Sequence, residues 1–257
     1  MLSGDTMQPL YASKKEPVKI GNIVFDGDPV IIAGPCSVES KENLLATIEP
    51  IRDSIHMIRG GTYKMRTSPY DFQGLGQEGL KILSDVSEEL GLPCVSEVMC
   101  IEEVGIAAKY VDALQVGARN MYNYRLLTAI GKSKIPVILK RGFSATMKEW
   151  FHAAEYILKE GNHNVILCER GIRSFDQNTR NVLDLAGAMY AKQHTGLPVI
   201  SDPSHGTGVR SLVVPMIRAS LAAGLDGVMI EVHTDPDAAT SDGHQTITPE
   251  ALQQSLS

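Results

Sequence analysis

Residues 198–232, PVISDPSHGTGVRSLVVPMIRASLAAGLDGVMIEV, contain one complete repeat of the pattern that decides the fold. Short apolar runs at 198–202 and 226–232 are typical of buried β-strands. The segment at 214–225 between them has the spacing of an amphipathic helix. A strand, a helix and a second strand in this order predict a right-handed crossover between two parallel strands.

The same alternation extends along most of the 257-residue chain. Eight apolar, β-branched runs lie at 30–34, 57–65, 93–98, 113–117, 136–140, 164–168, 198–202 and 226–232. Seven longer segments with helix-like spacing separate them, and 42–55 and 80–91 are two further clear examples. Eight such units in about 230 residues predict an α/β fold, a closed (β/α)8 or TIM barrel, rather than an open doubly wound sheet. No GxGxxG motif follows the first run, which also argues against a dinucleotide-binding sheet.

The chain is predicted to form one domain, because no linker or change of composition interrupts the pattern. Residues 1–17 are polar and aperiodic, and we expect an N-terminal tail there. Residues 18–27 alternate around Gly21-Asn22, which predicts a β-hairpin across one end of the domain. Residues 18–257, with this hairpin, are predicted to form a single (β/α)8 barrel that carries any catalytic site.

Composition excludes several classes of partner. The net charge is −6, which argues against a general surface for polyanions. Aromatic residues make up only 5%, too few for the stacking platforms that bind nucleic acids. Small anionic substrates must therefore be held by a local basic cluster.

The location of the protein is predicted from what the sequence lacks. No apolar run reaches the roughly 20 residues that cross a bilayer, and residues 1–17 lack the apolar stretch of a signal peptide. We therefore expect a cytoplasmic protein with no membrane partner. Four cysteines occur without a CxxC pair, and in a reducing compartment we expect buried thiols or ligands: Cys36, Cys94, Cys100 and Cys168.

Basic residues gather where the predicted strands end. In such barrels functional side chains lie at the C-terminal ends of the strands. Seven of the 24 basic residues fall there: Lys64, Arg66, Arg119, Lys140, Arg141, Arg170 and Arg173. This ring predicts a site for phosphate and carboxylate groups, to which arginine can bind with two hydrogen bonds. For any single member, a solvated ion pair at the rim is the alternative interpretation.

A second set of rim residues could hold a metal ion. Cys36 follows the first strand, His205 follows the seventh, Glu231 ends the eighth, and Asp242 lies in the loop after it. They are expected to be neighbours because the first and eighth strands adjoin in a closed barrel. Mixed sulfur, nitrogen and oxygen ligands suit Mn, Fe, Co or Zn better than Ca or Mg. From spacing alone, His233 and His244 are equally plausible ligands.

Seven segments resemble one family of enzymes. They are IIAGPCSVES, KMRTSPYDFQGLG, QVGARNMYN, ILKRG, CERGIRSFD, SDPSHGTG and EVHTDPDAATSDGHQ, and they occur in order between residues 18 and 250. Together they resemble the type I 3-deoxy-D-arabino-heptulosonate 7-phosphate (DAHP) synthases, in the short barrel-only form of the subgroup shared by archaeal and Gram-positive enzymes. The resemblance implies a (β/α)8 barrel that condenses phosphoenolpyruvate with erythrose 4-phosphate and water, giving DAHP and phosphate. This is the first step of the shikimate pathway, and the resemblance implies a homodimer or homotetramer.

The resemblance also implies roles for individual residues. One divalent ion (Mn, Fe, Co or Zn) would be held by Cys36, His205, Glu231 and Asp242. Phosphoenolpyruvate would be held by Arg119, Lys140 and Arg170, with Arg59 nearby. Erythrose 4-phosphate would be held by Lys64, Arg66 and Thr67. The catalytic set would be Lys64, Cys36 and His205, with Lys64 as general acid. Glu97 could orient the attacking water, or it could be paired with a rim arginine.

One residue departs from the family pattern. The family motif is Lys-Pro-Arg-Thr, and this chain has Met65 in place of the proline. The loss of a residue with fixed φ loosens the loop that aims the aldose-binding side chains. The aldose is therefore less certain than the class of reaction. Alternatives are a 3-deoxy-D-manno-octulosonate 8-phosphate synthase, whose Asn-rich motif KMRTSP does not resemble, another phosphoenolpyruvate–aldose synthase, or an inactive barrel that acts as a binding or regulatory subunit.

Related enzymes of this subgroup often carry a regulatory domain before the barrel. Only about 28 residues precede the first predicted barrel strand here, too few to build a domain core. We therefore expect no inhibition by aromatic amino acids, chorismate or prephenate, apart from a site that an oligomer could form.

Overall fold

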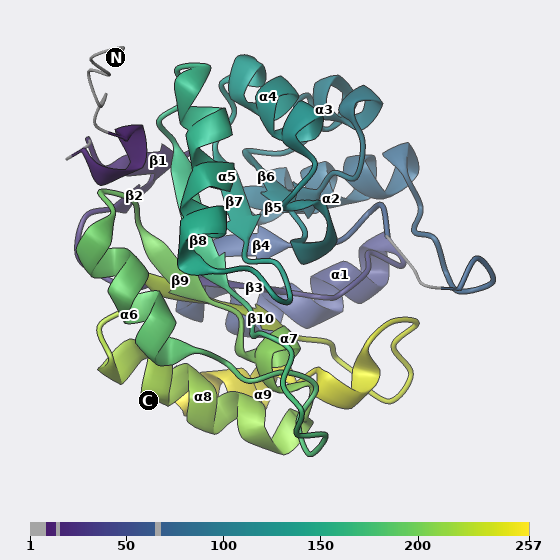
Figure 1. Ribbon diagram of the computed structural model, residues 1–257. Helices are drawn as coiled ribbons and strands as arrows, with labels where there is room; N and C mark the ends of the chain where they lie inside the picture. Colours follow the sequence, from purple (N-terminus) through teal and green to yellow (C-terminus); the bar gives the residue numbers. More distant parts are fainter. Residues whose placement is uncertain (1–8, 14–15, 65–67, 257) are drawn as a thin grey trace, which may run out of the picture.

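The computed structural model describes residues 9–13, 16–64 and 68–256. Eight parallel strands form a closed barrel surrounded by helices, as predicted (Figure 1). The strands are β3 (Val30–Gly34), β4 (Met57–Arg59), β5 (Cys94–Glu97), β6 (Ala113–Val116), β7 (Val137–Lys140), β8 (Val165–Glu169), β9 (Val199–Ser201) and β10 (Gly227–Glu231). The last strand closes the barrel by pairing with the first, from Gly227 opposite Val30 to Glu231 opposite Gly34.

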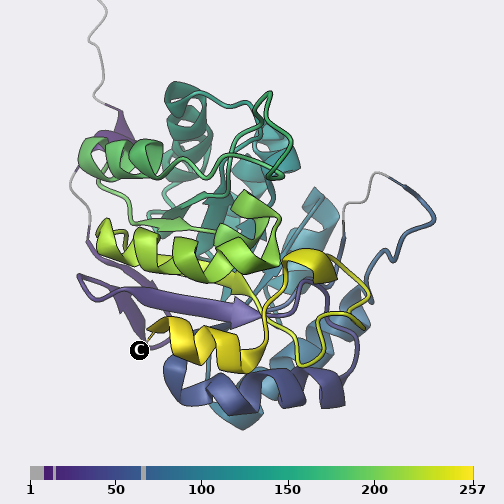
Figure 2. The ribbon, with the colours of Figure 1, turned by 90° about the horizontal axis from the view of Figure 1, so that it is seen from below.

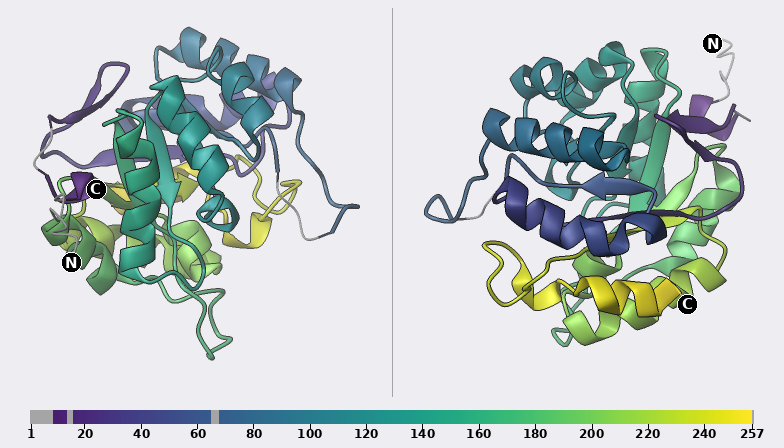
Figure 3. Two further views of the ribbon diagram at one scale, coloured as in Figure 1. Left: turned by 45° about the horizontal axis from the view of Figure 1, so that its top comes forward. Right: turned by 180° about the vertical axis from the view of Figure 1, so that it is seen from behind.

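Helices cover the outside of the barrel on all sides, as the two views of Figure 3 show. They are α1 (Lys41–Ile48), α2 (Gln77–Leu90), α3 (Ile101–Ala107), α4 (Tyr124–Ser133), α5 (Met147–Lys159), α6 (Leu185–His194), α7 (Pro203–Thr207), α8 (Arg210–Ala222) and α9 (Pro249–Leu256). Seen from below, α8, α9 and α1 lie along one side (Figure 2). In the part of the chain that the structure describes, no helix has both the length and the apolar character needed to cross a membrane.

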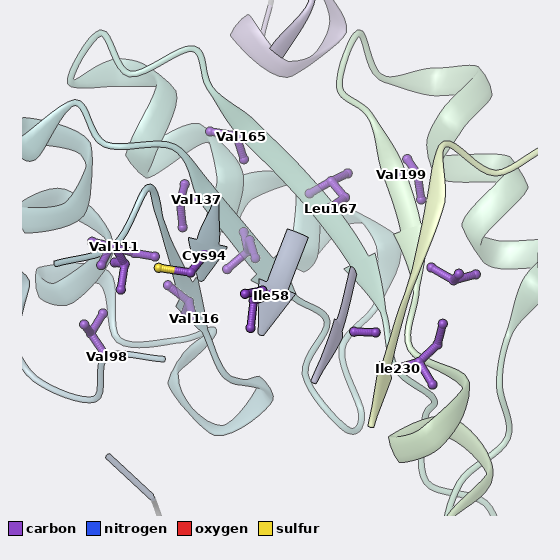
Figure 4. Packing of buried hydrophobic residues seen from close by; sticks show 14 of the residues in the cluster. Ile58, Cys94, Val98, Val111, Val116, Val137, Val165, Leu167, Val199 and Ile230 are labelled. Atoms are coloured by element: carbon purple, nitrogen blue, oxygen red, sulfur yellow. The ribbon is translucent and has the colours of Figure 1, made fainter. Parts of the chain in front are cut away.

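The strand residues alternate between two apolar layers, as a period of two requires. One set faces the helices and includes Ile58, Cys94, Val137 and Ile230 (Figure 4). The other set fills the barrel, and it consists of Val30, Ile32, Met57, Val95, Ala113, Ile138, Ile166, Cys168, Ile200 and Met229. The barrel is therefore a packed core, and any cavity must lie beyond one end of this filling.

The N-terminal hairpin closes one end of the barrel. Strands β1 (Val18–Ile20) and β2 (Ile23–Phe25) pair antiparallel around Gly21, which has a φ of 57°. The four buried apolar side chains of the hairpin belong to the same cluster as the barrel filling. Because full burial of such a side chain contributes about 1.5–3 kcal/mol, the hairpin stabilises this end substantially. The cavity must then be at the opposite end, where the strands have their carboxyl termini.

Three predicted boundaries were wrong. The run 57–65 is a strand only as far as Arg59, since a Cβ at Gly61 would lie 2.4 Å from the carbonyl oxygen of Cys36. The predicted helix 42–55 is α1 followed by a 3₁₀ helix η2 (Glu49–Ser54), because Pro50 has no N–H to continue the α-helical pattern.

The third concerns the predicted tail. Residues Leu10–Ala12 form a 3₁₀ turn, η1, against α5. The backbone N–H groups of Leu10 and Tyr11 donate to the two carboxylate oxygens of Glu155, at 2.9 and 3.1 Å. This part of residues 1–17 is thus tied to the barrel by a pair of charge-assisted hydrogen bonds.

Candidate functional site

The alternation inside the barrel continues past the apolar filling and places polar side chains at its C-terminal end. Each of these residues follows a filling residue by two positions: Arg59, Glu97, Gln115, Lys140, Arg170, Asp202 and Glu231. Apart from Glu97, which is partly exposed, all are nearly fully buried. Buried charges persist only when they are paired or await a charged ligand.

Four of the predicted residues come together as a possible metal site. The ligand atoms of Cys36, His205, Glu231 and Asp242 all lie within 4.8 Å of one another. Cys36 lies two residues beyond β3 and Glu231 ends β10, so the pairing that closes the barrel brings them together. His205 is on α7, and Asp242 precedes the 3₁₀ helix η4 (Gly243–Gln245) with a φ of 52°, a left-handed conformation that aspartate tolerates better than most residues.

The two alternative histidines do not join this group in the part of the chain that the structure describes. His233 is buried, and its Nδ1 accepts a hydrogen bond from the N–H of Asp235 at 2.9 Å. Its Nε2 lies 3.5 Å from Glu39. His244 is exposed on η4.

Neighbouring side chains orient two of the four residues. His205 Nδ1 lies 2.8 Å from Asp202 Oδ2, which also accepts from Lys140 Nζ at 2.5 Å. Burial lowers the pKa of His205, although Asp202 opposes the change, so the ring is neutral at pH 7. The hydrogen bond to Asp202 assigns the proton to Nδ1 and leaves the lone pair on Nε2.

Glu231 is held in the same way. Arg59 donates to its Oε1 at 2.8 Å, and Gln245 donates to its Oε2 at 2.6 Å. Burial opposes ionisation, but His205 and Arg59 outweigh it and lower the pKa of Glu231. His205 Nε2 lies 3.3 Å from Glu231 Oε1 and 3.8 Å from Asp242 Oδ2. Lone pairs thus converge on one point, which is the arrangement that a cation stabilises.

Cys36 completes the group. Its Sγ lies 3.0 Å from both Lys64 Nζ and Ser241 Oγ, and 3.3 Å from Asp242 Oδ2. Burial raises the pKa of the thiol to about 12, with Glu231 adding to the effect, so the thiol is protonated at neutral pH. A metal ion would have to displace this proton. A thiolate, an imidazole and two carboxylates are donors that suit a borderline divalent ion, and the group fits one.

A cavity of about 210 Å³ opens beside these four residues. It is lined by Lys64, Asp71, Glu97, Gly117, Ala118, Arg119, Lys140, Phe143, Arg170, Arg180, His205 and Asp242. Metal-site residues and cationic side chains therefore share one chamber.

The basic residues of the rim divide into two sets. Three are neutralised: Arg59 by Glu231, Lys140 by Asp202, and Arg141 by Glu169 and Asp184, each at 2.9 Å or less. For Arg141, the ion-pair interpretation is correct. Arg119, Arg170 and Arg173 instead lie over the ring of Phe143, and within the described residues none of them has a carboxylate at ion-pair distance.

Arg170 is the most unusual member of the second set. It is 2% exposed, and its Nη1 makes a 3.4 Å hydrogen bond to the carbonyl of Gly171. Burial lowers its pKa to about 10. A guanidinium that loses its water without gaining a carboxylate is destabilised until an anion binds. The arrangement therefore favours an anionic ligand in the cavity.

Two predicted residues at the cavity can be placed, and two cannot. Lys64 Nζ donates to the carbonyl oxygen of Cys36 at 2.8 Å as well as to its sulfur, so it lies between the metal site and the cavity. Glu97 accepts from Gln115 at 2.8 Å, and no rim arginine pairs with it among the described residues. Gly117 leaves room for this carboxylate, since a Cβ there would lie 2.2 Å from Oε1. Arg66 and Thr67, like Met65, lie outside the described residues.

Sequence reasoning missed Asp202, Gln245 and Phe143. The alternation could have placed Asp202 inside the barrel, because Ile200 belongs to the filling. Gln245 and Phe143 are on loops, where no periodic signal exists.

The fold and the site define a (β/α)8-barrel enzyme that acts on an anionic substrate beside a possible metal centre. Residues 10–257 match the model of the DAHP synthetase I family. The chain belongs to this family, which confirms the predicted resemblance and enzyme class, a 3-deoxy-7-phosphoheptulonate synthase.

Individual relatives agree with this assignment. The phospho-2-dehydro-3-deoxyheptonate aldolase of Thermotoga maritima is 45% identical over 238 residues, which cover 92% of this chain and 69% of that protein. A crystal structure of the aldolase (DAHP synthase) from Thermotoga maritima superposes with a TM-score of 0.91 at 42% identity, over 95% of this chain and 72% of that one. The 2-dehydro-3-deoxyphosphooctonate aldolase of Desulfatibacillum aliphaticivorans is 35% identical, over 91% of this chain and 92% of that protein.

Proposed function

We propose that the chain condenses phosphoenolpyruvate with erythrose 4-phosphate and water to give DAHP and phosphate, the first step of the shikimate pathway. The observation that carries the proposal is the shared cavity. The four-residue donor group lies at one wall, arginines without carboxylate partners lie at another, and Lys64 lies between them. A reaction that joins a phosphorylated carboxylate to an aldehyde requires these three elements together.

Phosphoenolpyruvate would bind at the arginine wall. Arg119 and Arg170 have guanidinium groups available for its phosphate and carboxylate. Lys140 would contribute less charge, since Asp202 already neutralises it. Arg59 is paired with Glu231, so we assign it to the support of the metal site rather than to direct contact with the substrate.

The divalent ion would be Mn, Fe, Co or Zn, held by Cys36, His205, Glu231 and Asp242. When bound, it would supply Lewis-acid polarisation of the aldehyde carbonyl, a stabilisation of several kcal/mol. Lys64 would donate a proton to the new alkoxide as C3 of phosphoenolpyruvate forms the carbon–carbon bond. Glu97 would orient the water that adds at C2 before phosphate leaves. Arg66 and Thr67 would hold the aldose phosphate, as the motif implies, and the enzyme would act as a homodimer or homotetramer.

The aldose is tested by comparing two substrates. We expect kcat/KM with erythrose 4-phosphate to exceed that with arabinose 5-phosphate by at least about 100-fold, because a site that holds a phosphate at a fixed distance from the carbonyl rejects a longer sugar. The readout is phosphate release from phosphoenolpyruvate, with the product identified by mass spectrometry. Arabinose 5-phosphate is the necessary competitor, since relatives named octulosonate aldolases match the chain. A preference for arabinose 5-phosphate would contradict the proposal and make Met65 the first residue to test.

A further inference from the structure

Three guanidinium groups surround one aromatic ring at the cavity. The guanidinium carbons of Arg170, Arg173 and Arg119 lie 4.7, 5.0 and 5.3 Å from the ring centroid of Phe143. These carbons are therefore no more than about 10 Å from one another. The ring lines the cavity together with Arg119 and Arg170.

The three arginines come from different parts of the chain. Arg119 is on the 3₁₀ helix η3 (Ala118–Asn120) after β6, and Arg170 and Arg173 follow β8. Phe143 is on the loop between β7 and α5, so it lies between them in the order of the barrel. The backbone N–H of Arg173 donates to the carbonyl oxygen of Phe143 at 2.7 Å, which fixes the ring's loop to the loop after β8.

Such a cluster needs a source of attraction. Three like charges within about one Debye length repel one another, and among the described residues no carboxylate pairs with them. The face of an aromatic ring is negative, and it attracts a guanidinium placed within about 6 Å of its centroid. A single ring that contacts all three can hold them near one point without neutralising them.

We propose that Phe143 is a positioning residue that gathers Arg119, Arg170 and Arg173 into one cradle for the phosphate group of the substrate. A carboxylate in the same place would also hold the arginines, but it would cancel the charge that the phosphate needs. The ring organises the cations and leaves their hydrogen-bond donors free for the ligand. This inference deepens the proposed function, on which its kinetic arm rests, and it adds Arg173 to the anion site.

The first test is the variant Phe143→Leu, which removes the π face and keeps an apolar side chain. We expect KM for phosphoenolpyruvate to rise about 5- to 30-fold, equivalent to about 1–2 kcal/mol at 1.4 kcal/mol per tenfold change. We expect kcat to fall by less than about threefold and KM for the aldose phosphate to stay within about twofold. Phe143→Tyr, which keeps the ring, should restore KM to within about twofold of the original value.

A second measurement is independent of turnover. Inorganic phosphate is titrated calorimetrically into the original protein and into Phe143→Leu and Phe143→Tyr. We expect phosphate to bind about 5- to 30-fold more weakly to the leucine variant only. This titration separates a failure of the inference from a failure of the proposed function, because it reports on the cradle even if phosphoenolpyruvate is not the substrate.

Phe175→Leu is the matched control, since this phenylalanine lies in the loop after β8 but is 99% exposed. It should change neither KM nor phosphate affinity by more than about twofold. The cradle is wrong if Phe143→Leu binds phosphate and phosphoenolpyruvate as the original protein does, or if Phe143→Tyr loses as much affinity as Phe143→Leu. If the leucine variant does not fold, Phe143→Met replaces it under the same criteria.

Discussion

Replacing Lys64 with alanine is expected to lower kcat by about 10²- to 10⁴-fold, the range for loss of a positioned general acid. The ammonium lies 3.0 Å from Cys36 Sγ and borders the cavity, which puts it where a proton must reach the new alkoxide. The measurement is the steady-state rate of DAHP formation from phosphoenolpyruvate and erythrose 4-phosphate. Lys64→Arg should not rescue the rate, because a guanidinium does not release its proton near neutral pH.

Two controls separate this chemical role from a structural one. The metal content of Lys64→Ala should stay close to that of the original protein, since Lys64 is not among the four donor residues. Lys81→Ala, on α2, removes an exposed lysine whose only printed ion pair is with Glu78, and the rate should change by less than twofold. A fall in kcat of less than tenfold, with metal retained, would remove Lys64 from the mechanism.

The second large effect is expected at Cys36. Cys36→Ala removes the sulfur donor, and we expect metal affinity to fall by at least about 100-fold and activity to fall with it. Cys94→Ala is the matched control, because Cys94 is a buried thiol on β5 that faces the helices. It should leave metal affinity within about twofold. Equal metal affinity in the two variants would show that Cys36 is not a ligand.

The same site predicts a pH dependence. The Cys36 thiol has a pKa of about 12 without metal, so binding must release one proton, whereas His205 is already neutral near pH 7. Protons compete with the metal, and affinity should therefore rise with pH, by about tenfold per unit between pH 6.5 and 8.5. The dependence should flatten in Cys36→Ala. Metal affinity of the original protein that does not change with pH would contradict a thiolate ligand.

Much of the fold could be predicted from the sequence because its signal is local and repeated. Each apolar run, such as 226–232, has a strand inside it, and the pairing of the last strand with the first explains why Cys36 and Glu231 meet. The strand period also determines which polar residues point into the barrel. Asp202 could have been found in this way, since it follows Ile200 by two positions.

Other features depend on contacts that leave no periodic signal. The early end of β4 at Arg59 follows from the close approach of Gly61 to Cys36, two residues far apart in the sequence. The division of the rim cations depends on which carboxylates they meet, so Arg141 and Arg170 look alike in sequence and differ in the fold. Phe143 gathers its arginines from two other loops, which only the closed barrel brings together.

The central claim is that one divalent ion, held by Cys36, His205, Glu231 and Asp242, is required for condensation in the cavity beside it. The most direct measurement is DAHP formation by one preparation in three states: as purified, after removal of metal with EDTA, and after addition of one equivalent of Mn²⁺ or Co²⁺. We predict that activity is lost on chelation by at least about 100-fold and returns with a stoichiometry of one ion per chain. Undiminished turnover by rigorously metal-free protein would contradict the account.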